Sequence, residues 1–180
     1  MIEEIPQEII GYLTKKGVSI EDEKTIEELK IKGYGEENDK KLMLKDYEAI
    51  FLLYTNMIKV LEEDKEISLN NLVDFALLRD SNAWTRFLIF RDLRSRGYVV
   101  REGFGFGSDF RVYDRGDYGS RPAKYVVCGL NEGTKMTIKE LNDNVNQNKK
   151  MGKETVIAVL ERRGEAIYYK IRVWMPYMDE

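Results

Sequence analysis

The stretch that most constrains the fold runs from Arg91 to Tyr113, with the sequence RDLRSRGYVVREGFGFGSDFRVY. Its pattern predicts the last turns of a helix, a stop at Gly97, a strand, a glycine-aromatic hairpin and a second strand, because glycine readily takes the backbone conformations that end helices and reverse strands. Basic and aromatic side chains alternate along it, a pattern suited to contact with a phosphate backbone. A helix that leads directly into paired strands predicts a domain of mixed α and β structure here.

The part of the chain before this stretch predicts a small α+β domain, residues 1–80. Apolar side chains at helical spacing predict a helix over residues 45–56. Ser68 is placed to cap a second helix over residues 71–78. The segment 21–32, rich in Glu and Lys, fits either a short helix or a charged loop followed by a strand.

The rest of the chain, residues 81–180, predicts a second domain that begins at the capping residues Asp80-Ser81-Asn82. A helix over residues 83–96, with one apolar and one cationic face, leads into it. Thr137 and Glu140 have the capping-box spacing, which predicts the start of a helix over residues 137–144. The expected strands cover residues 98–101, 109–113, 124–128, 155–160 and 166–174, with a turn at 163–165.

The absence of histidine excludes several kinds of chemistry. The chain has 180 residues, a net charge of −3 and no histidine, so a Ser-His-Asp triad and a histidine metal site are excluded. Cys128 is the only cysteine, which excludes an internal disulfide and a multi-cysteine metal site, and we expect it to be buried. Since the net charge is slightly negative, any binding of nucleic acid must depend on local patches.

Two further motifs favour a structural interpretation. Residues 103–107, GFGFG, lack the full spacing and the strand-to-helix context of a dinucleotide loop, so we expect a tight hairpin. A metal-dependent nuclease needs clustered carboxylates, but Asp109 and Asp114 are five positions apart and would face opposite sides of one strand. The sequence therefore predicts no metal site and no cofactor.

Tyr113, Tyr118 and Lys153 are candidates for chemistry on a phosphate. A tyrosine close to a cation can accept a proton, and a lysine can stabilise the charge that develops on phosphate in the transition state. The alternative is a structural role, since tyrosines in β-rich chains commonly pack and surface lysines are commonly solvated. The residue types alone leave both interpretations open.

The hydropathy of the chain favours the cell interior. No run approaches the roughly 18 apolar residues of a membrane span. The first residues, MIEEIPQEIIGYL, are acidic where a signal peptide would be basic. The sequence thus predicts a soluble, cytoplasmic protein.

Two stretches, FLIFRDLRSRGYVVREGFGFGSDFRVY and VIAVLERRGEAIYY, resemble the archaeal tRNA-intron splicing endonucleases, and the resemblance extends from about Gly33 to Trp174. It implies a small N-terminal α+β domain and a C-terminal restriction-endonuclease-like domain with a mixed sheet and flanking helices. It also implies metal-independent cleavage of precursor tRNA at a bulge-helix-bulge. In that reaction the 2′-hydroxyl attacks the adjacent phosphate and leaves a 2′,3′-cyclic phosphate and a 5′-hydroxyl.

The resemblance assigns the catalytic positions of the family one at a time. The tyrosine that acts as general base falls on Tyr113, with Tyr118 as a second choice, and the lysine that steadies the charged transition state falls on Lys153. The histidine that acts as general acid falls on Pro122, which has no titratable group. The arginine that clamps a base of the bulge falls on Asn146. These absences indicate the non-catalytic structural subunit, which pairs with a catalytic paralogue in an α₂β₂ tetramer.

The sequence also suggests surfaces for RNA and for other subunits. Four arginines around the end of the second-domain helix are candidate RNA contacts: Arg91, Arg94, Arg96 and Arg101. In the family, subunits pair through C-terminal strands, and an acidic loop of one dimer enters a basic cleft of the other. The corresponding residues are Tyr168, Tyr169, Ile171, Val173 and Trp174 in the strand and Glu132 in the loop. From its pattern alone the strand fits an internal core strand equally well as an exposed edge.

Two alternatives to the structural subunit remain open. One is an active homo-oligomer that uses Tyr113, Tyr118 and Lys153 without histidine. The other is a module that binds structured RNA without cleaving it. Only the structural subunit requires a different partner chain.

Overall fold

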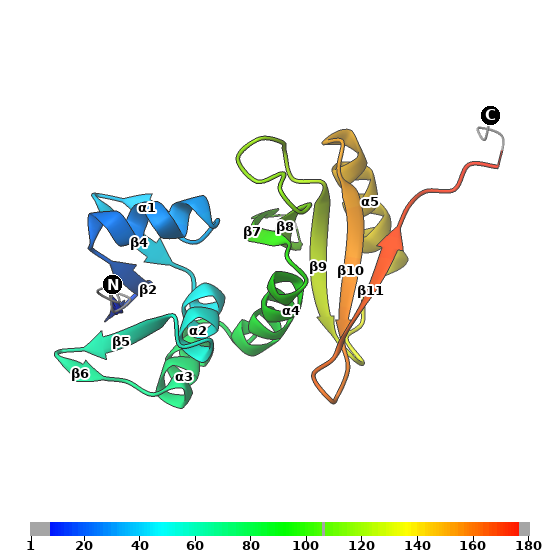
Figure 1. Ribbon diagram of the computed structural model, residues 1–180. Coiled ribbons are helices and arrows are strands. Elements are labelled where there is room, and N and C mark those ends of the chain that lie inside the picture. The colour runs from blue at the N-terminus through cyan, green and yellow to red at the C-terminus, as the bar shows by residue number, and fades with distance from the viewer. Residues whose placement is uncertain (1–7, 106, 177–180) are drawn as a thin grey trace. The chain divides into compact units, whose positions relative to one another are not determined.

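The structure is a computed structural model that describes residues 8–105 and 107–176 (Figure 1). It separates into two compact units, Met1–Phe90 and Arg91–Glu180. Helix α4 (Ala83–Ser95) is shared, because its residues up to Phe90 belong to the first unit and the rest to the second. None of the helices in the described part of the chain combines the length and apolar character that crossing a membrane requires.

The first unit contains a mixed six-stranded sheet in the order β3-β4-β2-β1-β5-β6. The pair β1–β5 is parallel, whereas the other neighbours are antiparallel. All four residues of β2 are buried, since that strand lies between β1 and β4. The strands are β1 (Ile9–Thr14), β2 (Gly17–Ile20), β3 (Glu36–Asn38), β4 (Lys41–Leu44), β5 (Ile58–Glu62) and β6 (Lys65–Glu66).

Three further helices lie in the first unit: α1 (Glu23–Ile31), α2 (Asp46–Tyr54) and α3 (Leu69–Arg79). The side chain of Asp22 caps α1 by accepting from the backbone N–H of Thr25 at 2.9 Å, so the strand predicted as one alternative within residues 21–32 is wrong. Ser68 caps α3 as predicted, because its hydroxyl accepts from the N–H of Asn71 at 3.2 Å.

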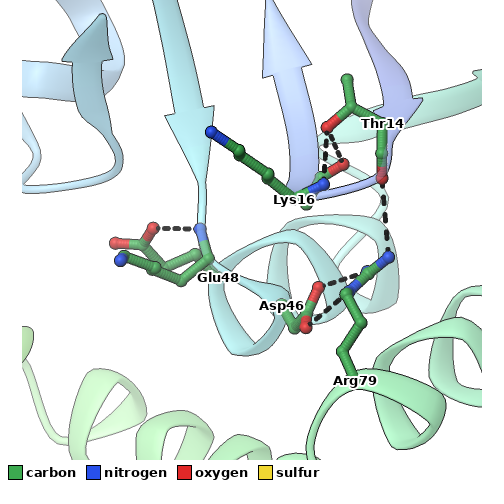
Figure 2. Close-up of polar contacts among 7 residues, drawn as sticks. Thr14, Lys16, Asp46, Glu48 and Arg79 are labelled. Carbon is green, nitrogen blue, oxygen red and sulfur yellow. Dashed lines mark hydrogen bonds and ion pairs between the residues drawn. The ribbon is translucent and has the colours of Figure 1, made fainter.

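Arg79 connects three elements of the first unit (Figure 2). Arg79 is the last residue of α3, and Asp46 is the first residue of α2. Arg79 Nε donates to Asp46 Oδ2 at 3.1 Å, and Arg79 Nη2 donates to Asp46 Oδ1 at 2.5 Å. Its Nη1 reaches the carbonyl of Thr14, the last residue of β1, at 3.5 Å. The two side chains are partly buried, with 25% of the Arg79 side chain and 17% of the Asp46 side chain exposed, so solvent screens the pair only in part.

We expect Arg79→Ala to lower the free energy of unfolding of the first unit by about 2 kcal/mol, because it leaves the Asp46 carboxylate without its forked partner. Arg79→Lys should lose about half as much, since lysine keeps the charge but not the fork. Urea unfolding followed by Trp84 fluorescence in a Trp174→Phe background would measure the change. As a control, Lys41→Ala removes an ion pair with Glu21 that is about half exposed, and should change stability by less than about 0.5 kcal/mol.

The second unit contains a mixed five-stranded sheet in the order β11-β10-β9-β8-β7. Strands β9 and β10 are parallel and are joined through α5 (Ile138–Lys150), whereas the other neighbours are antiparallel. The strands are β7 (Val99–Gly105), β8 (Ser108–Tyr113), β9 (Tyr125–Asn131), β10 (Glu154–Leu160) and β11 (Ala166–Ile171). Together the two sheets confirm the predicted mixed α and β fold.

Several local predictions hold in the second unit and one does not. Thr137 and Glu140 form the predicted capping box, although α5 continues six residues beyond the predicted end at residue 144. Strands β7 and β8 pair as the predicted hairpin as far as Gly105 and Ser108, and a Cβ on Gly103 would lie 2.4 Å from the carbonyl oxygen of Ser108. The strand predicted over residues 166–174 ends at Ile171, so Val173 and Trp174 lie outside it.

Candidate active site

The positions of the candidate tyrosine, histidine and lysine lie at one end of the second sheet. Tyr113 is the last residue of β8, residue 122 lies three positions before β9, and Lys153 directly precedes β10. The strand register pairs Val112 with Tyr125 and pairs Tyr125 with Glu154. The end of β8 and the starts of β9 and β10 therefore lie side by side.

Lys153 is fixed beside the histidine position. Its half-buried ammonium donates to the carbonyl oxygen of Ala123 at 2.5 Å, and Ala123 directly follows Pro122. Its backbone N–H donates to the carbonyl of Asn148 at 2.9 Å, which ties the start of β10 to α5. A cation restrained in this way can face a negative phosphate without a large reorganisation.

Tyr113 is packed against Tyr118 from the loop that follows β8. The two ring centroids lie 5.0 Å apart with the rings nearly perpendicular, and both side chains are half-buried. The backbone of this loop is closed at its far end, where the N–H of Lys124 donates to the carbonyl of Val112 at 3.0 Å. The contact gives both tyrosines a packing role, and a role of either one as a proton acceptor stays a prediction.

Position 122 offers an exposed site without a proton donor. Pro122 is exposed in the loop between β8 and β9, and the sequence has no histidine to replace it from elsewhere in the chain. Asn146, at the position of the clamping arginine, is half-buried in α5. The site therefore combines a tyrosine and a lysine with no candidate general acid of the imidazole type.

The carboxylates considered for a metal serve other contacts. Asp109 Oδ2 accepts from the N–H of Gly129 at 2.7 Å and thereby links β8 to β9. Asp114 lies 3.7 Å from the Lys124 ammonium. Within residues 8–105 and 107–176, no three His, Cys, Asp or Glu side chains gather as a set of metal ligands. Cys128 is buried, and burial raises the pKa of its thiol to about 11.

Each of the four candidate RNA-binding arginines already has an interaction partner within the chain. Arg96 Nε donates to Asp92 Oδ2 at 2.9 Å, and this hydrogen bond raises the pKa of the Arg96 guanidinium. Its guanidinium carbon also lies 5.8 Å from the centre of the Tyr168 ring. Arg91, Arg94 and Arg101 are half-buried and each has an interacting partner. Their contact with RNA stays a prediction.

Strand β11 lies at the edge of the sheet and pairs only with β10 among the described strands, which removes the alternative of an internal strand. Tyr169 is 51% exposed and Trp174 is 75% exposed, Val173 is also exposed, and Ile171 is half-buried. Tyr168 differs, because its hydroxyl donates to Asp92 Oδ2 at 2.7 Å; burial and this hydrogen bond raise the pKa of Tyr168. Glu132 is exposed, with Oε2 3.6 Å from Nε of Arg162.

Two features were missed by the sequence interpretation. Asp92 joins Arg96 and Tyr168, and only the spacing of four residues between Asp92 and Arg96 was visible as a signal. A hollow beside Lys153 also brings together Lys149, Lys170 and Arg172. These residues come from different elements, so no local pattern in the sequence could indicate their proximity.

Family models for two domains match this chain. Residues 9–73 match the family model described as the tRNA intron endonuclease N-terminal domain, and residues 83–169 match that described as its catalytic C-terminal domain. A tRNA-splicing endonuclease of Pyrococcus furiosus is 34% identical over 161 residues, which cover 89% of this chain and 93% of the relative. A protein of the same name from Methanococcus vannielii is 32% identical over 91% of this chain and 93% of its own. The chain belongs to the tRNA intron endonuclease family.

Proposed function

We propose that this chain is the structural subunit of a cytoplasmic tRNA-splicing endonuclease that removes introns from precursor tRNA at bulge-helix-bulge sites. Its partner would be a catalytic paralogue that carries the histidine, in an α₂β₂ assembly. The observation that carries the proposal is Pro122 at the histidine position, in a chain that has no histidine at all. Relatives named tRNA-splicing endonuclease cover nearly the whole chain and support the assignment of the substrate.

The chemistry of the reaction explains why the missing histidine matters. The 2′-oxygen forms a bond to the adjacent phosphorus while its proton passes to a base, and the bond from phosphorus to the 5′-oxygen breaks. The departing 5′-oxygen then needs a proton, which a general acid supplies. Removing a positioned acid or base costs roughly 10²–10⁴-fold in rate. Pro122 has no proton to donate, so this chain would be a poor enzyme by itself.

Tyr113 and Lys153 support the alternative of an active homo-oligomer, because both family residues remain at one end of the sheet. Tyr113 would act as the base and the Lys153 ammonium would face the phosphate. The Lys153 ammonium donates to the carbonyl of Ala123 in the loop between β8 and β9. This contact would hold the loop in a structural subunit as well, so the presence of Lys153 does not by itself indicate activity. A module that binds structured RNA without cleavage is the remaining alternative.

The exposed edge of β11 supports a contact with another subunit. Unpaired backbone groups along an edge strand can accept a strand from a second chain. Tyr169, Ile171, Val173 and Trp174 would add apolar contacts, with Tyr168 held from the other side by Asp92. Glu132 is the only acid in the loop 130–133 and would be the residue to enter a basic cleft.

Reconstitution tests the proposal. Purified alone, the chain is expected to leave a bulge-helix-bulge RNA uncut, and addition of the histidine-containing paralogue is expected to produce cleavage at both bulges. Gel analysis of the labelled RNA and native mass spectrometry of the mixture would measure both results. In the reconstituted complex, Tyr113→Phe in this chain should change the cleavage rate by less than about twofold, because phenylalanine keeps the ring contact with Tyr118 and only the proposed vestigial base is lost.

The control is a phenylalanine at the corresponding tyrosine of the paralogue, which should lower the cleavage rate of the same complex by roughly 10²–10⁴-fold. Robust cleavage by this chain alone, lost in Tyr113→Phe, would instead establish the active homo-oligomer. Binding of the RNA without cleavage and without association with the paralogue would leave only the RNA-binding module.

A further inference from the structure

A hollow opens where β10 begins and β11 has ended, beside the last turn of α5. Its volume is about 230 Å³, and four cationic side chains line it: Lys149, Lys153, Lys170 and Arg172. The register that pairs Thr155 with Ile171 brings the start of β10 next to the end of β11. Because Lys153 belongs both to this lining and to the candidate active site, the hollow lies directly beside that site.

The charges of this hollow do not cancel. Among the residues that the structure describes, Glu154 is the only acid in this lining, and it forms an ion pair with Lys170. Lys153 donates to a neutral carbonyl, so its charge is not compensated by that contact. Lys149 and Arg172 are exposed, and within the described residues their side chains make no ion pair or hydrogen bond. Three positive charges therefore remain around one small hollow.

The helix C-terminus explains only a part of this cluster. Lys149 and Lys150 lie in the last turn of α5, where cations oppose the negative end of the helix dipole. Lys170 lies in β11 and Arg172 follows it, so the dipole of α5 does not account for their positions. Lys150 is not among the lining residues. The cluster thus gathers cations from two parts of the chain around a shared space.

A polyanion with regularly spaced charges fits such a surface best. Lysine and arginine bind phosphate groups, and proteins that follow a nucleic-acid backbone do so with rows of these residues. The four arginines near α4 are less suited, since Arg96 is paired with Asp92 and the others also have partners. The hollow offers uncompensated charge at the end of the sheet where the candidate Tyr113 and Lys153 lie.

We propose that Lys149, Lys170 and Arg172 form, with Lys153, a groove that binds backbone phosphates of the RNA next to the cleavage position. The identity of the ligand as RNA rests on the proposed function. The groove holds the RNA backbone in register at the end of the sheet, and this task does not require the missing histidine. It gives a structural subunit a direct part in placing the substrate.

The test measures how binding of a fluorescein-labelled bulge-helix-bulge RNA by the full chain depends on salt. Each phosphate contact contributes about 0.7–0.9 to the slope of log K against log salt. The double variant Lys149→Gln/Arg172→Gln should therefore reduce the slope by roughly 1.5. The reduction should be the same on a plain RNA duplex of equal length, because contacts with phosphate do not depend on the RNA sequence. Lys150→Gln/Arg163→Gln removes the same charge from exposed positions outside the groove and should leave the slope within about 0.3 of the original.

The possible results separate the groove from the proposed function. An equal loss of slope in both double variants, or no loss in the groove variant, overturns the groove and leaves the reconstitution result standing. A selective loss in the groove variant without any cleavage by the reconstituted complex supports the groove and overturns the structural-subunit function. A wild-type chain that binds neither RNA overturns the groove, and the proposed function is then decided by the reconstitution. All four substituted side chains are exposed, and thermal unfolding would verify that the variants fold.

Discussion

Replacing Pro122 with histidine is expected to raise the rate at which this chain alone cleaves a bulge-helix-bulge RNA by about 10²-fold. The new imidazole would stand in the exposed loop next to Ala123, whose carbonyl holds the Lys153 ammonium, and across the sheet end from Tyr113. The gain should be at the low end of what a general acid provides, since Asn146 still replaces the arginine that clamps the bulge. Single-turnover cleavage of labelled RNA would measure it.

The pH dependence identifies the origin of this gain. A general acid acts in its protonated form, so the added rate should fall as the pH rises through the histidine pKa, about 6.5 when unperturbed. The neighbouring Lys153 ammonium disfavours a second positive charge and should move this fall to lower pH.

Pro122→Asn is the matched control, because asparagine relieves the same proline constraint without a titratable group and should give no gain. Lys153→Ala or Tyr113→Phe in the histidine variant should remove the gain. If the histidine variant folds and binds the RNA but stays inactive, the end of this sheet is not arranged for the reaction.

The parts of the structure that the sequence predicted depend on local signals. Ser68 and Thr137 cap helices because a hydroxyl there reaches a backbone N–H within the next turn, which needs no distant partner. Gly97 ends α4 with a φ of 89°, a conformation that the residue type itself favours. The family resemblance predicted the two domains and the mixed α and β fold.

The parts that could not be predicted depend on partners far apart in the chain. Strand β2 has only four residues between charged segments, and its burial follows from the neighbours β1 and β4. The hydroxyl of Tyr168 donates to Asp92, 76 residues earlier. A tyrosine that was expected at a subunit surface therefore makes a hydrogen bond within its own chain. The groove cations come from the last turn of α5, from the residue before β10, and from the end of β11 and the residue after it, and the pairing of β10 with β11 brings them together.

Phe90 is expected to be the most costly side chain to remove from the first unit. Its ring is fully buried in α4, with the centroids of Tyr47, Phe51 and Tyr34 at 5.0, 5.6 and 6.4 Å. Phe90→Ala removes the buried ring and leaves a cavity, which costs about 3–5 kcal/mol. That loss is comparable with much of the roughly 5–15 kcal/mol that stabilises a typical domain. Urea unfolding followed by Trp84 fluorescence in the Trp174→Phe background would measure it.

The graded and control variants distinguish a packing effect from a general sensitivity of the helices. Phe90→Leu keeps an apolar side chain of intermediate volume and should lose about half as much stability as alanine. Leu78→Ala removes a side chain that is 84% exposed in α3 and should change the free energy of unfolding by less than about 0.5 kcal/mol. Equal losses for Phe90→Ala and Leu78→Ala would contradict a core centred on this aromatic cluster. A loss confined to the Phe90 variants would show that this ring contributes to the core of the first unit, to which α4 also gives the fully buried Phe87 and Ile89.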